Sequence, residues 1–527
     1  MRKRFNDTGV CVKAQHFMVD ITPKIMQILD MIENQDYFII NRPRQFGKTT
    51  ALFRLYTELL KKEEYLVILL SFEGIGEVYF QSEDTFQRAV VSMLNRELKN
   101  AYPAQTIFIN ENFETLDTGL DKLSLQISDF VGKVGKQVVV LIDEVDKSTN
   151  NQLFLHFLGM LRNKYLKRDL PNQGTFHSVV LVGVHDVKTI KLKIRPDEEK
   201  KLNSPWNIAV DFKVNMSFSP AEIEGMLRVY SAEKQIDMDC QILAERLYYY
   251  TSGYPFLVSK MCKVVDEILL PEKDNKQEWT LQDIENAFRY LVKENYTTTI
   301  FDDLFKNIEN NRELHQLVKD VVLNGLRVPF NANDYLIELA ATYGVFDRDA
   351  PFCRIHNRIF EQRIYFYYIA QAIRKGEHNT TELIGDSYSS LAGELNIPKI
   401  LRKFQAFMQE NYSAQDAHFI EREGRLLFLS FLKPIINGRG FDFKEPNIGE
   451  ERRMDIVITY TAHRYILELK IWRGEEYHTQ GIKQLAEYLD LYQQKEGYLL
   501  IFNFNKNKAF KEETIQIGDK TILAVWV

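Results

Sequence analysis

Near the start of the chain stands the sequence Tyr37-Phe38-Ile39-Ile40-Asn41-Arg42-Pro43-Arg44-Gln45-Phe46-Gly47-Lys48-Thr49. Its first four residues are apolar and β-rich, and a helical run, Thr50–Leu60, follows it. A strand, a tight loop and the start of a helix form the context that a phosphate-binding P-loop requires. Arg42 stands where the general pattern G-x-x-x-x-G-K-[ST] has its first glycine, so a chance Gly-Lys-Thr remains the alternative.

A P-loop wraps phosphates with backbone N–H groups and with the N-terminus of the following helix. Lys48 is then expected to reach the β- and γ-phosphates, and the Thr49 hydroxyl to bind Mg²⁺. The predicted nucleotide-binding residues are Arg44, Gln45, Phe46, Gly47, Lys48, Thr49, Thr50 and Asp143.

A second motif supports nucleotide binding. The apolar run Gln137–Ile142 ends in the paired carboxylates Asp143 and Glu144. Asp143 is predicted to hold Mg²⁺ together with Thr49, and Glu144 to polarise the attacking water. Alone, this motif also fits a buried strand capped by two solvated acids. After the loop, and in this order, it predicts a P-loop ATPase that uses ATP and Mg²⁺.

The wider pattern predicts an α/β protein. Apolar, β-rich runs at Tyr37–Ile40, Tyr65–Phe72, Gln137–Ile142 and Ser178–Val184 alternate with helical lengths, which indicates a parallel sheet flanked by helices. A capping box at Ser219–Glu222 opens a helical stretch. The predicted domains are an ATPase core (1–215), a helical lid (216–298), a winged-helix-like module (299–375), a linker (376–397) and a mixed α/β restriction-endonuclease-like domain (398–527).

Several motifs resemble those of the bacterial AAA-ATPase-like family. They are residues 37–50, Leu141–Asp146, Asn203–Ala209 and the Gly-Tyr-Pro element in Thr251–Phe256. In that family the loop commonly reads R-x-R-Q-[FY]-G-K-T, so Arg42 fits the family. The resemblance covers about residues 10–375 and implies a P-loop ATPase with a helical lid.

Related ATPases carry a γ-phosphate sensor where the Ser178–Val184 run ends, and His185 or Asp186 can fill that role. A simple polar pair at the end of a strand explains them equally well. Arg195 or Arg354 can act as an arginine finger, although a solvated surface arginine is the ordinary interpretation of each.

The C-terminal part contains a β-hairpin, with Met454–Tyr460 as one strand and Arg464–Trp472 as the other. Alternation along a strand places Glu468 and Lys470 on one face, beside Ile466 and Trp472, where buried charges are costly unless they pair or bind something. Asp455 is expected to converge on Glu468 and to hold Mg²⁺ or Mn²⁺, with Lys470 orienting a water. A cross-strand salt bridge on an exposed hairpin is the alternative.

This D-x₁₂-E-x-K spacing resembles the PD-(D/E)XK nuclease superfamily, with Met454 in place of the proline of the name. Gln484 and Tyr488 match the Q-x-x-x-Y element of RecB-type nucleases, and Glu421, rather than Glu423, matches a further metal-binding acid. The resemblance spans about residues 400–527. The implied catalytic residues are Asp455, Glu468, Lys470, Gln484 and Tyr488; the implied metal ligands are Glu421, Asp455 and Glu468.

Composition sets outer limits. The 527 residues have a net charge of −6, which argues against a protein that coats nucleic acid but permits a local basic site. No run of 18 apolar residues exists, and the N-terminus leads into no apolar stretch, so neither a membrane span nor a secretory signal is expected. Cys11, Cys240, Cys262 and Cys353 form no C-x-x-C pair, which predicts buried, reduced thiols in a cytoplasmic protein.

Three segments are candidates for contact with nucleic acid. Asn357–Tyr368 interleaves basic and aromatic residues, although at helical spacing such aromatics are more often core. Lys506–Lys508 and the pair Arg452–Arg453 can bind phosphates or be solvated turns. The sequence predicts an ATPase that gates a nuclease acting on DNA, and leaves a homo-oligomer open. A nucleotide-switched signalling or scaffold protein with an inert nuclease-like domain is the alternative.

Overall fold

The computed structural model describes residues 3–73, 75–103, 107–145, 152–171, 173–184, 208–293, 296–323, 326, 328–374, 394–411, 428–429, 431–432, 440–444, 454–460, 463–472, 474–504 and 510–527. Within these ranges the side chains of a few residues, Asp455 among them, are outside the description. The chain forms two compact units. One comprises residues 1–291 and 338–344, and the other comprises residues 292–337 and 345–527.

The first unit is built on a four-stranded parallel sheet with the order β3-β6-β5-β4. Its strands are β3 (Tyr37–Asn41), β4 (Tyr65–Ser71), β5 (Gln137–Asp143) and β6 (Ser178–Gly183). They coincide with the four predicted strands, because continuous apolar runs suit strands that are buried on both faces. Val210 adds a parallel bridge to Phe38 beside β3.

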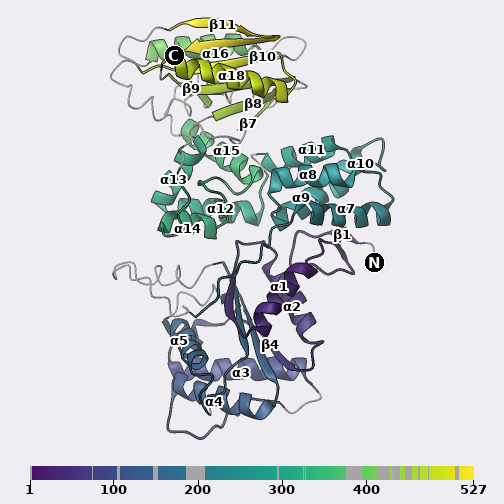
Figure 1. Cartoon of the computed structure of the whole chain (residues 1–527), viewed down its shortest axis with the longest axis vertical. Helices are drawn as coiled ribbons and strands as arrows, with labels where there is room; N and C mark the ends of the chain where they lie inside the picture. Colours follow the sequence, from purple (N-terminus) through teal and green to yellow (C-terminus); the bar gives the residue numbers. More distant parts are fainter. Residues whose placement is uncertain are drawn as a thin grey trace. The chain divides into compact units, whose positions relative to one another are not determined.

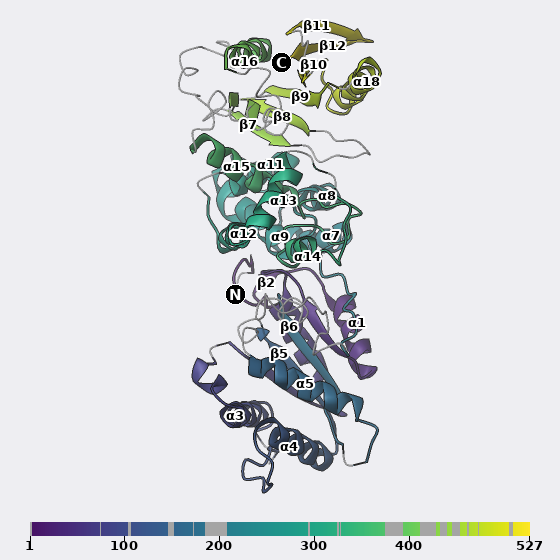
Figure 2. The same cartoon turned by 90° about the vertical axis from the view of Figure 1, so that its left-hand side faces the viewer.

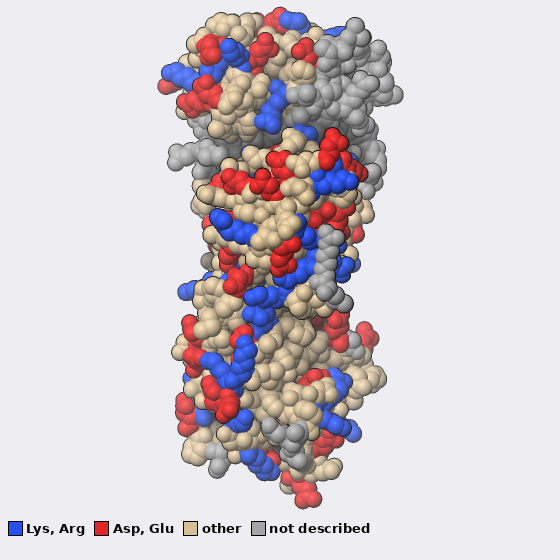
Figure 3. All heavy atoms as spheres, turned by 90° about the vertical axis from the view of Figure 1, so that its right-hand side faces the viewer, with Lys and Arg blue, Asp and Glu red and all other residues tan. Residues whose placement is uncertain are grey.

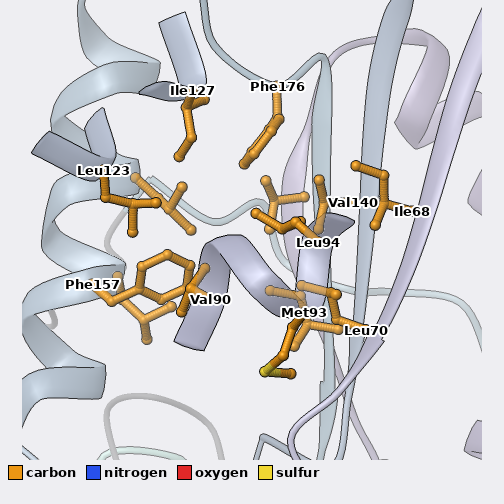
Figure 4. Close-up of a cluster of buried hydrophobic side chains, with 14 of the residues drawn as sticks. Ile68, Leu70, Val90, Met93, Leu94, Leu123, Ile127, Val140, Phe157 and Phe176 are labelled. Atoms are coloured by element: carbon orange, nitrogen blue, oxygen red, sulfur yellow. The ribbon is translucent and has the colours of Figure 1, made fainter. Parts of the chain in front are cut away.

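Helices cover both faces of this sheet (Figures 1 and 2). One face carries α1 (Thr22–Glu33) and α2 (Lys48–Leu59); the other carries α3 (Glu83–Ala101), α4 (Gly119–Val134) and α5 (Gln152–Leu166), with the short η1 (Glu77–Phe80) before α3. Figure 4 shows side chains of the helices meeting those of the strands in the core, among them Val90, Leu94, Leu123, Ile127, Phe157, Ile68 and Val140.

The helical stretch predicted after residue 219 is also found in the structure. It contains α7 (Pro220–Lys234), α8 (Cys240–Thr251), α9 (Pro255–Val264), the π-helical turn η3 (Val265–Leu269), α10 (Leu270–Glu272) and α11 (Leu281–Val292). The predicted capping box is present, with Ser219 and Glu222 each bonding the other's backbone. Two short N-terminal strands, β1 (Arg4–Phe5) and β2 (His16–Phe17), pair in parallel, and β1 packs against α9.

All four cysteines are free. Cys240, Cys262 and Cys353 are buried as expected, but Cys11 is only half-buried, so the prediction of buried thiols is wrong for that residue. Cys11 lies in the N-terminal segment between β1 and β2, where its backbone rather than its thiol makes the structural contact with α2.

The second unit begins with helices α12 (Thr299–Glu309) and α13 (Arg312–Leu323). After α14 (Tyr335–Thr342), whose residues from Glu338 on belong to the first unit, bridges Phe346–Ile355 and Pro329–Phe352 form a short β-piece, and α15 (Arg358–Arg374) follows. Phe360, Phe366 and Tyr368 of α15 are buried, which favours the core interpretation of this aromatic segment over contact with nucleic acid. The winged-helix assignment and the domain boundaries stay predictions.

The C-terminal part of this unit is a mixed six-stranded sheet with the order β11-β12-β10-β9-β8-β7. Its strands are β7 (Gly440–Lys444), β8 (Met454–Tyr460), β9 (His463–Ile471), β10 (Glu496–Phe502), β11 (Glu512–Ile517) and β12 (Lys520–Trp526). Strands β9, β10 and β12 run parallel to one another, and the other neighbours are antiparallel. Helix α16 (Ile397–Asn411) contacts β12, and α18 (Glu475–Leu491) contacts β10 and β12. The predicted α/β class is confirmed for both sheets.

In the described parts of the chain, no helix combines the length and apolar character needed to cross a membrane.

Candidate functional site

The loop between β3 and α2 has the backbone shape of a phosphate cradle. Gln45 and Gly47 both have positive φ angles, 57° and 78°, which turn the chain tightly before α2 begins at Lys48. The Lys48 ammonium donates to the carbonyl oxygens of Arg42 and Pro43, at 2.9 Å each. Lys48 therefore lies over the loop that it is predicted to serve.

Thr49 and Asp143 meet, although 94 residues separate them in the sequence. The Thr49 hydroxyl lies close enough to the Asp143 carboxylate to stabilise its charge, and the carboxylate accepts a hydrogen bond from the Glu144 amide at 2.9 Å. Burial raises the pKa of Asp143, while the Glu144 amide, the Thr49 hydroxyl and the Lys48 charge oppose the rise. A hydroxyl and a carboxylate held together are hard oxygen ligands, so this pair fits Mg²⁺.

Glu144, the predicted water-polarising residue, has a φ of 55°. A left-handed backbone is uncommon for a residue other than glycine, and such strain often occurs at functional positions.

The structure says less about the candidates for the γ-phosphate sensor and the arginine finger. His185, Asp186 and Arg195 lie outside the described residues, and Arg354 donates to Asp347 across the short β-piece at 3.0 Å.

The Gly-Tyr-Pro element of the helical stretch contacts the phosphate loop. The Tyr254 hydroxyl donates to the Arg44 carbonyl, and its ring meets the buried Phe46 ring edge-on, with centroids 4.7 Å apart. Gly253 has a φ of 70°, and a Cβ placed there would lie 2.0 Å from the Phe218 carbonyl oxygen. Only glycine fits that position, so it holds Tyr254 against the loop.

Arg42, which replaces the usual glycine, anchors the start of the loop. Its guanidinium donates to the carbonyls of Asn41 and Val214, at 2.9 Å each, and lies over the Phe212 ring with 5.0 Å to the centroid. A side chain at this position therefore supplies contacts that a glycine cannot make. Sequence reasoning had identified the departure at Arg42 but not these contacts.

Gly344 is a second loop contact that the sequence did not reveal. A Cβ at this position would lie 2.8 Å from Cγ and 2.9 Å from Cβ of Pro43, and the φ of Gly344 is 75°. Its signal in the sequence is weak, since a glycine after a helix is an ordinary terminating residue.

Thr50 has a structural partner. Its hydroxyl accepts a hydrogen bond of 3.1 Å from the Cys11 amide. The same N-terminal segment is tied to α9, where Lys260 and Lys263 pair with Asp7 at 2.7 and 2.6 Å. The N-terminal segment thus connects α9 with the first turn of α2.

The second group of predicted residues lies on the C-terminal sheet. Strands β8 and β9 pair with Asp455 directly opposite Glu468. Glu468 and Lys470 are only 2% and 6% exposed, so they are not solvated hairpin charges. Together with Ile466 and Trp472 they lie on the face of β9 that packs against apolar residues of α18. Glu421 lies outside the described residues.

Helix α18 carries the other two predicted residues. The buried Oε1 of Gln484 has no hydrogen-bond partner in the described structure, and the half-buried Tyr488 stacks on Tyr492 with centroids 6.2 Å apart. An orphaned buried oxygen beside the face that carries a buried carboxylate fits a polar ligand or ion. Among the side chains that are described, no three His, Cys, Asp or Glu residues form a metal-binding group.

Surface charge agrees with the nearly balanced composition. On the face drawn in Figure 3, the coloured acidic and basic side chains are interspersed along the chain.

Comparisons with known proteins identify both parts of the chain. Residues 7–340 match the family described as AAA-like domain, and residues 440–515 match the PD-(D/E)XK nuclease superfamily. A search among curated proteins found no match.

The solved structures to which the chain is similar include a Walker-type ATPase from Pyrococcus abyssi, with 13% identity, coverage of 69% of this chain and 99% of that one, and a TM-score of 0.44. The ORC2 protein of Aeropyrum pernix has 14% identity, coverage of 70% and 98%, and a TM-score of 0.38. The RuvB Holliday junction branch migration motor of Thermotoga maritima has 12% identity, coverage of 64% and 91%, and a TM-score of 0.31. At these values the similarities say nothing further about function.

Proposed function

The chain belongs to the family of proteins with an AAA-like domain and carries a PD-(D/E)XK nuclease domain, and from this premise we propose that it binds and hydrolyses ATP to gate a metal-dependent nuclease acting on DNA. The nucleotide half of the proposal depends on one observation above all, the approach of the Thr49 hydroxyl and the Lys48 ammonium to the Asp143 carboxylate.

In the proposed ATP site, each residue has a separate role. Loop amides and Lys48 bind the phosphates, and Lys48 neutralises charge on the γ-phosphate. Thr49 and Asp143 would hold Mg²⁺, which supplies charge stabilisation to the phosphates when bound. Glu144 accepts a hydrogen bond from the attacking water and directs the water at the γ-phosphorus. The Tyr254 contact brings the helical lid onto this loop, so nucleotide binding and lid position are linked.

In the proposed nuclease site, Asp455 and Glu468 would hold the divalent ion, which promotes in-line hydrolysis of a phosphodiester when bound. Lys470 orients the attacking water through its ammonium, and Gln484 offers a buried amide oxygen on the neighbouring helix. The support is the pairing of Asp455 with Glu468 and the burial of both Glu468 and Lys470 on one face. Two phosphate-handling groups on one chain favour nucleic acid as the substrate.

The nucleotide half is tested by phosphate release from ATP. Wild-type protein should hydrolyse ATP in the presence of Mg²⁺, and Lys48→Ala should abolish hydrolysis because it removes the ammonium that lies over the Arg42 and Pro43 carbonyls of the loop. Lys61→Ala, which changes an exposed lysine just beyond the same helix, serves as the control. Hydrolysis that survives Lys48→Ala would refute the assignment.

Gating is tested by cutting linear and circular DNA with Mg²⁺ or Mn²⁺, with ATP and without nucleotide. We expect the cleavage rate to change with ATP in the wild type and to be insensitive to ATP in Lys48→Ala. A cleavage rate that does not depend on ATP in either protein would show that ATP hydrolysis and DNA cleavage are independent activities. RNA as a parallel substrate decides which nucleic acid is cut.

A further inference from the structure

The Lys470 side chain ends against the backbone of α18. A Cβ placed on Gly481 would lie 2.0 Å from the Lys470 Nζ, 3.0 Å from its Cε and 3.1 Å from its Cδ. The last three atoms of the lysine therefore occupy the space that any other residue at position 481 would fill. Gly481 is in the interior of α18, where glycine is the least favourable residue other than proline.

The neighbours of Gly481 show what this contact orients. His478 and Gln484 lie three residues before and after Gly481, so each is a neighbour of Gly481 on the surface of α18. Burial lowers the pKa of His478, and the positive charges of Lys470 and Lys511 lower it further, against Glu475 and Glu513. The Lys470 ammonium thus lies against a helix turn that follows the buried His478 and precedes Gln484, whose buried Oε1 has no hydrogen-bond partner in the described structure.

We propose that Gly481 is a positioning residue of the nuclease site, because its missing side chain lets α18 hold the Lys470 ammonium on the Glu468 face of β9. The inference rests on the proposed nuclease function and adds to it a residue outside the motif. Because the obstructing atoms are the far end of a flexible side chain, a Cβ at position 481 displaces the ammonium and leaves the β9 backbone in place.

The test compares Gly481→Ala with Gly497→Ala in the full-length protein. A Cβ on Gly497 would lie 2.8 Å from Cδ1 of Leu489, so the control also crowds α18 but at an apolar side chain. With Mg²⁺ and DNA, Gly481→Ala should lower the cleavage rate at saturating DNA by about tenfold or more. Its KM for DNA and its Mg²⁺ requirement should stay within about twofold of wild type, because Glu468 is untouched. Gly497→Ala should retain the wild-type rate.

A double-variant cycle separates positioning from general stability. In a Lys470→Ala background the atoms that obstruct a Cβ at position 481 are gone, so Gly481→Ala should raise the thermal unfolding midpoint, as alanine favours the helix. In the wild-type background it should not raise the midpoint.

Two outcomes would overturn the inference and leave the proposed function intact. One is a Gly481→Ala protein that cleaves DNA as fast as an active wild type. The other is an equal rise of the thermal unfolding midpoint on Gly481→Ala in the wild-type and Lys470→Ala backgrounds. Wild-type protein that cuts no nucleic acid would instead refute the proposed function, and with it the catalytic meaning of Gly481.

Discussion

Tyr254→Phe tests the link between the helical lid and the phosphate loop. The substitution removes the hydroxyl that donates to the Arg44 carbonyl and keeps the buried ring against Phe46. Without that bond the loop is free to adopt shapes that do not fit a triphosphate, and the population that binds nucleotide falls.

The magnitude follows from the bond that is lost. A neutral hydrogen bond of this kind contributes about 1 kcal/mol, which corresponds to a roughly fivefold higher Kd for ATP. Tyr254→Leu also loses the edge-on ring contact with Phe46, worth about another 1 kcal/mol, so its Kd should rise roughly 25-fold.

Titration with a fluorescent ATP analogue in Mg²⁺ measures both Kd values. Tyr248→Phe, which alters an exposed tyrosine on α8, is the matched control and should bind like the wild type. A Tyr254→Phe protein whose Kd equals that of the control would show that the lid contact does not shape the loop.

Two further predictions concern the first unit. Gly344→Ala should raise the Kd for ATP, because the new Cβ would lie 2.8 Å from the rigid Pro43 ring in the loop. Gly225→Ala, which adds a Cβ in open space, is the control and should leave the Kd unchanged. Equal Kd values for the two variants would contradict the prediction. Lys164 is buried against the Ser124 carbonyl and the Ser128 hydroxyl, and burial lowers its pKa from 10.5 to about 8. Below pH 8 the buried lysine is protonated in the folded state, and the cost of burying its charge lowers the free energy of unfolding. Between pH 8 and 10.5 the folded protein loses this proton while the unfolded chain keeps it, so the free energy of unfolding increases with pH. Relative to Lys164→Met, the wild-type free energy of unfolding in urea should increase by about 2 kcal/mol from pH 7 to 9.5. A constant difference across that range would refute the low pKa.

Features that depend on local sequence were predictable. The strands of the parallel sheet are continuous apolar runs, and α7 begins directly after Ser219, where the capping box predicted the start of a helix. The pairing of Asp455 with Glu468 follows from the short sequence between β8 and β9, because the ladder continues to Tyr460 and His463 and thereby fixes the register.

Features that depend on chain folding were not. Tyr254 and Arg44 lie 210 residues apart, and no periodicity relates them. Gly344 and Gly481 look like ordinary glycines until the atoms opposite their missing side chains, Pro43 and Lys470, are known.

Thr50 is a residue to which the sequence motif assigns nucleotide binding and the structure adds another contact. The motif places it with the nucleotide ligands, but its hydroxyl already accepts a hydrogen bond from the Cys11 backbone. Its role in nucleotide binding stays a prediction.

The central claim is that the buried carboxylate on β9 belongs to a working nuclease in an ATP-binding protein. The most direct measurement is the rate of DNA cleavage by wild-type and Glu468→Gln proteins in Mg²⁺ and ATP, with ATP hydrolysis recorded in the same samples. We expect the wild type to cut and Glu468→Gln to be slower by about 100-fold or more, with hydrolysis unchanged. Equal cutting by both proteins would contradict the site, and no cutting by the wild type would favour an inert nuclease-like domain.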